Sequence, residues 1–227
     1  MTFNERKERE TQRYNALIHA KNVKNEEFYN GIYDRYQNEV LSRRHIPLEW
    51  RYDFNEAENP FFMERIMVNA AFNSGAVEFG GKIALAVRIE GADRKSYFAI
   101  AQSDSGIDNF TFGKYPVKLP KTDEIDTNVY DMRLTKHEDG CIYGLFCSEV
   151  KDYGADDTST AIARCGIVRT KDLERWERLP NLDARFQQRN VVLHPEFVNG
   201  KYLLYTRPAD GFVEVGGGGG IGCAFTD

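Results

Sequence analysis

The chain has 227 residues, of which 41% are apolar, and a formal net charge of −5. This composition is typical of one large globular domain or two small ones, and it excludes a disordered or fibrous chain. The negative balance argues against a nucleic-acid-binding surface. No apolar run approaches the roughly 18 residues that a membrane helix needs, and residues 1–7 lack the apolar core of a signal peptide.

Residues 2–45 are rich in Glu, Lys, Arg and Asn. Their apolar residues recur at three- and four-residue steps, which predicts one helix, or two if Asn30-Gly31 interrupts it. These residues are Leu17, Ile18, Phe28, Ile32, Tyr33, Tyr36, Val40 and Leu41. Residues 1–58 are therefore interpreted as an N-terminal helical extension, which is either solvated or packed against another subunit or the rim of the main domain.

From residue 59 onward, short β-type runs separated by Gly, Asp and Asn replace the helical pattern. The predicted strands are 65–72, 77–79, 82–89, 96–102, 129–134, 142–148, 161–169, 191–197, 202–207 and 222–225. We therefore expect residues 59–227 to form one all-β domain.

An internal repeat organises this domain. The segment 81–88 (GKIALAVR) aligns with 140–146 (GCIYGLF) and with 200–207 (GKYLLYTR), and each copy follows another strand. Such repeats of three or four strands are typical of β-propeller blades; the alternative is a β-sandwich with chance similarity. Only about three blades are present where propellers close with four to eight, so we expect a propeller truncated at the C-terminus.

The segment 128–134 (NVYDMRL) is predicted as a strand with Tyr130, Met132 and Leu134 on one face and Asp131 and Arg133 on the other. Two interpretations of the charged face stay open. It is either a surface ion pair on an edge strand or a catalytic acid held by its neighbours.

Other polar residues occur where predicted strands begin or end: Asn73-Ser74-Gly75, Arg88, Arg189 and Arg207. Equivalent strand ends of successive blades converge on one face of a propeller. We therefore expect Asp131 to meet the two later arginines there. A pair of guanidinium forks suits an oxyanion such as phosphate.

Three other patterns in the sequence do not predict a ligand or metal site. The glycine run 216–220 leads into a strand rather than a helix, which favours a loop near the active face over a nucleotide site. Asp152, Asp156 and Asp157 lack the spacing and closing Glu of a calcium loop. The four histidines are scattered, so we expect no metal and no catalytic triad.

The four cysteines show no paired C-x-x-C spacing. Cys141, Cys147, Cys165 and Cys223 lie in apolar or small-residue runs. We expect reduced, buried thiols in a cytoplasmic protein.

Four motifs resemble glycoside hydrolase family 130: NAAFNSGAV at 69–77, VYDMRL at 129–134, QRNVVLHPEF at 188–197 and GKYLLYTRPADGF at 200–212. A glycine-rich GGGGGIG follows them. The resemblance implies a five-bladed β-propeller with an N-terminal extension used in oligomer contacts. It also implies inverting phosphorolysis of β-1,4-mannosyl-glucose to α-mannose 1-phosphate and glucose.

The resemblance further implies roles for individual residues. Asp131 is similar to the family's catalytic acid, whose proton passes through the mannose 3-hydroxyl. The residues implied to bind the two sugars are Asn73, Ser74 and Arg88 for the mannosyl unit, and Tyr130, Arg94 and Asp210 for the second sugar. Arg189 and Arg207 match phosphate-binding arginines. A further lysine, histidine and aspartate of the family lie beyond residue 227.

The residue types agree with this chemistry. An inverting glycosidase needs one carboxylic acid and one carboxylate base. Phosphate is already an anionic nucleophile, so cationic clamps replace the base and no cofactor is needed beyond phosphate as co-substrate. The expected partners are a disaccharide, phosphate and further copies of the chain, with no nucleic acid and no membrane. The alternatives are a β-1,4-manno-oligosaccharide phosphorylase, a hydrolase of the same family, and a non-catalytic glycan-binding fragment.

Overall fold

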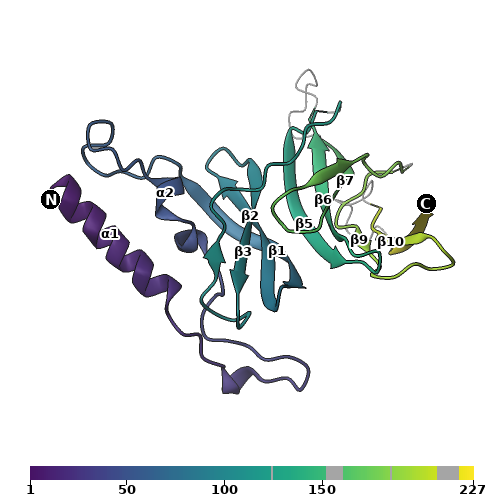
Figure 1. Cartoon of the computed structure of the whole chain (residues 1–227), viewed down its shortest axis with the longest axis horizontal. Coiled ribbons are helices and arrows are strands. Elements are labelled where there is room, and N and C mark those ends of the chain that lie inside the picture. The colour runs from purple at the N-terminus through teal and green to yellow at the C-terminus, as the bar shows by residue number, and fades with distance from the viewer. Residues whose placement is uncertain (124, 152–160, 185, 209–219) are drawn as a thin grey trace.

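The computed structural model describes residues 1–227 except 124, 152–160, 185 and 209–219. The chain runs along the long axis of the molecule, from a helix at one end through three successive β-sheets to the other end (Figure 1). The expected all-β class with a small helical content is confirmed. Among the described helices, none is both long enough and apolar enough to cross a membrane.

The three sheets are antiparallel, and their strands follow one another in sequence. The first sheet has the order β1-β2-β3-β4: Val68–Phe79, Lys82–Gly91, Ser96–Ser103 and Thr111–Phe112. The second has the order β5-β6-β7-β8: Asn128–Lys136, Ile142–Val150, Ile162–Thr170 and Glu177–Leu179. The third has the order β11-β10-β9: Gly222–Thr226, Tyr202–Thr206 and Val192–Leu193.

Three apolar clusters join these layers face to face. The N-terminal segment packs on the first sheet through Ile46, while Phe98 and Met132 belong to the cluster between the first and second sheets. Leu145 and Leu204 belong to the cluster between the second and third sheets. The central strands are buried on both faces, which explains why they read as nearly continuous apolar runs rather than as alternating ones.

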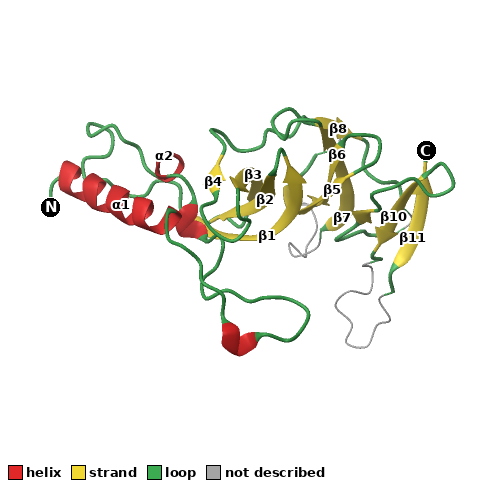
Figure 2. Ribbon diagram, turned by 60° about the horizontal axis from the view of Figure 1, so that its bottom comes forward, coloured by secondary structure: helices red, strands yellow, loops and turns green. Residues whose placement is uncertain are grey.

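The first helix, α1 (Phe3–Ile18), is shorter than the sequence suggested. It begins with a capping box in which Thr2 and Glu5 exchange hydrogen bonds. The prediction that the helical pattern continues to residue 45 is wrong. The segment that follows first projects away from the sheets, where it contains a short 3₁₀ turn at Glu26–Phe28 (Figure 2). It then returns to the first sheet at a second 3₁₀ turn, Arg43–His45, where Arg43 donates to the Val68 carbonyl.

The side chain of Asn30 helps to explain why no second helix forms in the segment after α1. Asn30 Oδ1 accepts the backbone N–H groups of Ile32 and Tyr33 at 3.0 and 3.1 Å. Such local bonds compete with helical ones. Ile32 is 87% exposed. The helical spacing of the apolar residues around it therefore corresponds neither to a helix nor to a buried core. A second helix, α2 (Leu48–Arg51), comes after the predicted segment.

The strand prediction needs smaller corrections. Residues 65–72 and 77–79 were expected as two strands, but β1 is one strand with irregular pairing between Phe72 and Gly75. The expected strand 191–197 is reduced to β9, and the short edge strands β4 and β8 were not predicted. Cys223 is exposed, whereas the other three cysteines are buried, and all four are free.

Candidate active site

The proposed acid, Asp131, lies at a bulge in β5. The pairing of β5 with β6 is shifted between Tyr130 and Arg133, and Asp131 has a φ of 56°. Asn73 in β1 and Asn190 just before β9 also have positive φ, of 45° and 56°. Asp and Asn adopt this left-handed conformation more readily than other residues with a Cβ. The repeat therefore places one such residue in the first strand region of each sheet, where the bulge turns its side chain out of the normal alternation.

The irregular pairing in β1 and β5 corrects two predictions made from the sequence. Asn73 lies inside β1 and not at a strand end. In β5 the expected alternation is interrupted, so Met132 packs in the core between the sheets while Tyr130 contacts polar residues. Asp131 does not pair with Arg133 but with a residue of the first sheet, so the surface ion pair of these two is excluded.

Two residues from the first sheet hold the Asp131 carboxylate. Arg88 Nη1 donates to Asp131 Oδ1 at 2.9 Å, and Asn73 Nδ2 donates to both carboxylate oxygens at 3.1 and 3.2 Å. The side chains of Asp131 and Arg88 are each 13% exposed. A charge-assisted pair at this depth is strongly directional, so the carboxylate has one fixed orientation.

Arg88 is itself fixed on every side. Its other nitrogens donate to Ser96 Oγ and to Glu90 Oε2, each at 3.0 Å. Its guanidinium carbon lies 4.4 and 4.8 Å from the ring centres of Phe72 and Tyr130. The two aromatic faces stabilise the cation, and this cation in turn orients the carboxylate of Asp131.

A second group links Tyr130 to Arg189. The Tyr130 hydroxyl donates to Glu149 Oε1 at 2.5 Å, and Arg189 Nη1 donates to Glu149 Oε1 at 2.8 Å and to the Tyr130 hydroxyl. Burial, followed by the bonds to Cys147 and Glu149, raises the pKa of Tyr130. The phenol therefore stays protonated and remains a donor.

Arg189 keeps its charge in this setting. Burial opposes the charged form, but the hydrogen bond that Arg189 donates to Glu149 and the neighbouring acidic groups outweigh it, so the pKa of Arg189 is raised. Within the described residues, only Nη1 of this guanidinium has a protein partner. Its remaining N–H groups are available to a ligand.

The strand register brings Arg207 to Arg189. An antiparallel bridge pairs Gln188 with Pro208, so the residues next to it, Arg189 and Arg207, lie opposite each other. The backbone N–H of Arg207 also donates to the buried Gln188 side chain at 3.2 Å. The two arginines expected to act together are thus close, and Arg189 reaches the direct neighbour of Asp131.

The other predicted site residues are placed as follows. Ser74 lies in the β1 bulge beside Asn73. Arg94 is largely exposed in the turn after β2, with its Nε 3.9 Å from Glu90. Asp210 lies outside the described residues, as do Asp152, Asp156, Asp157 and residues 216–219 of the glycine run. In the described part of the chain, no group of His, Cys, Asp and Glu forms a metal site.

Four residues of this network were not predicted as site residues. Glu90 and Glu149 orient the arginines, and Arg133 donates to the Asn73 carbonyl and the Asn190 side chain at 3.3 and 3.4 Å. The signal for the two acids was in the repeat, because Glu90 and Glu149 occupy equivalent positions at the ends of β2 and β6. The signal for Asn190 was also in the repeat, where this residue occupies the position equivalent to that of Asp131.

Two solved structures have a similar arrangement of antiparallel sheets. A glycosyl hydrolase from Bacteroides ovatus superposes with a TM-score of 0.53 at 19% identity, over 69% of this chain and 46% of that one. A second structure superposes with a TM-score of 0.56 at 19% identity. It comes from work on the GH130 family of mannoside phosphorylases, a family that contains glycoside hydrolases that target β-1,2 mannosidic linkages in Candida mannan. This superposition covers 82% of this chain and 53% of that one. These similarities establish the fold.

Two relatives in sequence are both mannoside phosphorylases. The chain is 57% identical over 227 residues to the 4-O-β-D-mannosyl-D-glucose phosphorylase of Bacteroides fragilis. The aligned stretch covers 99% of this chain and 58% of that protein. The chain is also 32% identical over 114 residues to the β-1,2-mannobiose phosphorylase of Listeria innocua. This second aligned stretch covers 50% of this chain and 29% of that protein. No protein-family model matches. The resemblance expected from the motifs is confirmed, over little more than half the length of the first relative.

Proposed function

We propose that the chain belongs to glycoside hydrolase family 130 and carries the acid and the phosphate clamp of a mannosylglucose phosphorylase. The reaction would cleave β-1,4-mannosyl-glucose with inorganic phosphate and inversion, giving α-D-mannose 1-phosphate and D-glucose. One observation carries the proposal: two side chains link Asp131 to Arg189, because Arg88 donates to Asp131 and lies against the ring of Tyr130, whose hydroxyl accepts from Arg189.

The chemistry follows from the charges present. A β-mannoside leaving group needs a proton, and Asp131, in its protonated form, is the group proposed to supply it. The attacking phosphate is already anionic and needs neutralisation rather than deprotonation. Arg189 and Arg207 lie opposite each other and suit this clamping role. One acid with two arginines favours phosphorolysis over hydrolysis.

The remaining roles are proposed from the same network. Asn73, Ser74 and Arg88 would bind the mannosyl unit beside Asp131. The second sugar would lie against Tyr130, Arg94 and Asp210. We propose no cofactor besides phosphate as co-substrate.

The architecture we propose is a five-bladed β-propeller formed by blades like the three sheets of residues 59–227. The face-to-face packing of these sheets through successive apolar clusters supports it. Residues 1–58 would form an N-terminal extension that takes part in homo-oligomer contacts, and the protein would act in the cytoplasm.

The test is phosphorolysis by the Asp131→Asn variant. Asn73 and Asn190 already occupy the equivalent left-handed positions, so asparagine fits at 131 without strain. We expect phosphate-dependent release of mannose 1-phosphate from mannosylglucose by the wild type, and a loss of at least about a hundredfold in the variant, with an unchanged circular dichroism spectrum. Wild-type turnover retained in the variant would contradict the role of Asp131.

A second candidate, a phosphorylase of mannobiose or longer β-mannosides, is favoured by the similarity to the Listeria innocua protein. The reverse reaction separates the two. With mannose 1-phosphate as donor, a mannosylglucose phosphorylase prefers glucose as acceptor, and a mannobiose phosphorylase prefers mannose. Release of free mannose without phosphate would instead indicate a hydrolase, and binding without turnover a glycan-binding module.

A further inference from the structure

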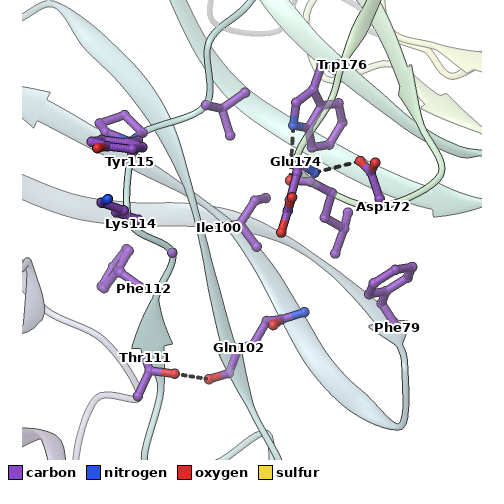
Figure 3. A pocket seen from close by; sticks show the side chains of 14 residues that line it. Phe79, Ile100, Gln102, Thr111, Phe112, Lys114, Tyr115, Asp172, Glu174 and Trp176 are labelled. Atoms are coloured by element: carbon purple, nitrogen blue, oxygen red, sulfur yellow. Dashed lines mark hydrogen bonds between the residues drawn. The ribbon is translucent and has the colours of Figure 1, made fainter.

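A cavity of about 500 Å³ lies between the outer strands of the first and second sheets (Figure 3). Its walls come from the end of β1, from β3, from β4 with the loop that follows it, and from the turn between β7 and β8. Asp131 is on β5, at the opposite edge of the second sheet from β8. Three strand spacings, roughly 14 Å, separate those edges. The cavity is therefore distinct from the candidate active site.

Hydrogen bonds hold the rim beside β4. The backbone N–H of Gly113 donates to the carbonyl of Ile100 at 2.9 Å. The indole N–H of Trp50 donates to the carbonyl of Lys114 at 3.2 Å. The loop that carries Tyr115 is thus fixed to the sheet on one side and to the N-terminal segment on the other.

The opposite rim is fixed as well. Asp172 accepts the backbone N–H groups of Glu174 and Arg175 at 2.9 and 2.8 Å. These bonds hold the pKa of Asp172 well below its usual range. The indole of Trp176 donates to the Leu173 carbonyl at 3.2 Å. Both rims are therefore formed before any ligand arrives, which lowers the entropic cost of binding.

The lining combines aromatic rings with unpaired polar groups. The rings are Phe79, Phe112, Tyr115 and Trp176. Between them, the amide of Gln102 and the carboxylate of Glu174 point into the open space (Figure 3). Neither side-chain group has a hydrogen-bond partner among the residues that the structure describes. The ammonium of Lys114 lies 5.2 Å from the Tyr115 ring centre and adds a donor at the rim.

We propose that this cavity is a second carbohydrate site, which binds a short neutral oligosaccharide. A pyranose ring offers an apolar C–H face to aromatic rings and hydroxyl groups to amides and carboxylates. The two acids and one lysine at the rim do not favour an anion. The volume lies in the range of small-ligand pockets. The proposal does not depend on the catalytic role of Asp131.

The two tryptophans of the chain make the test direct. Trp176 lines the cavity, and Trp50 packs against its lining residue Phe112 at 5.7 Å between ring centres. Intrinsic fluorescence therefore reports on this site. We would titrate the whole chain with β-1,4-mannotetraose in the absence of phosphate. A saturable fluorescence change is expected, and its absence at millimolar sugar overturns the proposal.

Variants locate the binding. Tyr115 is 70% exposed, so Tyr115→Ala leaves the core intact, and we expect it to raise the Kd about fivefold or more. Glu174→Ala provides a second variant of the cavity. Tyr29→Ala, at an exposed tyrosine on the N-terminal segment, and Asp131→Asn should bind like the wild type. Wild-type affinity in both cavity variants, or loss of binding in Asp131→Asn alone, would refute the second site. A failed phosphorolysis assay would leave this measurement unaffected.

Discussion

At the scale of single residues, the candidate site depends on side chains in an unusual backbone conformation. Asn73, Asp131 and Asn190 all have positive φ, and each lies in or just before the first strand of a different sheet. In that conformation the side chain leaves the regular alternation of a strand. As a result Asn73 and Asp131, on separate strands, make direct hydrogen bonds.

The guanidinium of Arg189 offers the clearest test of the phosphate clamp. Arg189→Ala should raise the KM for phosphate by roughly tenfold to a hundredfold, the loss expected for one or two charge-assisted hydrogen bonds. The KM for the disaccharide should change less. Initial rates measured over a phosphate series give both values.

Arg189→Lys is the matched control for charge. Lysine keeps the positive charge but loses the planar fork that reaches Glu149 and leaves further donors for a ligand. We expect an intermediate KM for phosphate. Unchanged phosphate kinetics in both variants would remove Arg189 from the clamp.

At the scale of secondary-structure elements, the approach of β1 to β5 controls the site. A Cβ added at Gly75 would lie 2.4 Å from the Met132 carbonyl oxygen and 2.8 Å from the Leu134 nitrogen. Both atoms belong to the β5 backbone and cannot rotate away. Glycine at this position is therefore required for the close contact that lets Asn73 reach Asp131.

Gly75→Ala should separate β1 from β5. We expect a loss of about 1–3 kcal/mol in the free energy of unfolding, together with a fall in kcat, because the bonds to Asp131 lengthen. Urea denaturation and initial rates measure the two effects. Gly220→Ala, at a glycine with no atom within 4 Å of the added Cβ, should have neither effect.

The core between the first two sheets is a second feature of this scale. Met132 is fully buried next to Gly144, whose missing side chain leaves room for its sulfur. Met132→Ala should lower the free energy of unfolding by about 2–5 kcal/mol, through lost burial and a residual cavity. Met67→Ala, at a methionine that is 65% exposed, should change it little. Equal effects in urea denaturation would contradict this assignment of the core.

At the scale of the whole molecule, the layers stack from the N-terminal segment to the third sheet. His45 lies at the first junction, beside the fully buried Ile46. The backbone N–H of Ser42 donates to His45 Nδ1 at 2.9 Å. Burial lowers the pKa of His45, and the nearby Arg44 charge lowers it further. The folded protein therefore contains this imidazole in its neutral form.

The sign of the resulting pH dependence follows from linkage. Because the pKa of His45 is lower in the folded than in the unfolded chain, its contribution is complete above about pH 6.5. It is lost as the pH falls through the folded-state pKa, because the unfolded chain then binds the extra proton. Urea denaturation between pH 7.5 and 5 should show a decline that His45→Gln makes shallower. The same change at the exposed His19 should leave the decline as it is.

Much of the layered fold could be predicted from the sequence. The repeat that includes Gly81, Gly140 and Gly200 identified the central strands, because a strand buried on both faces has a strong apolar signal. The N-terminal segment could not be predicted in the same way. Its aromatic residues have helical spacing, but the side chains of Asn25 and Asn30 accept local hydrogen bonds from backbone N–H groups, which favours turns, and no core covers Ile32.

The sequence by itself determined which residues are candidates: one aspartate, Asp131, and two arginines, Arg189 and Arg207, which lie in or at the ends of strands of a repeated unit. Only the tertiary structure decided how they are held. The bonds of Asn73 and Arg88 to Asp131, and of Glu149 to Arg189, join different sheets or distant strands. They depend on bulges that shift the register and on the packing distance between sheets. Neither is encoded in the spacing of residues along one strand, because both arise only when separate strands come into contact.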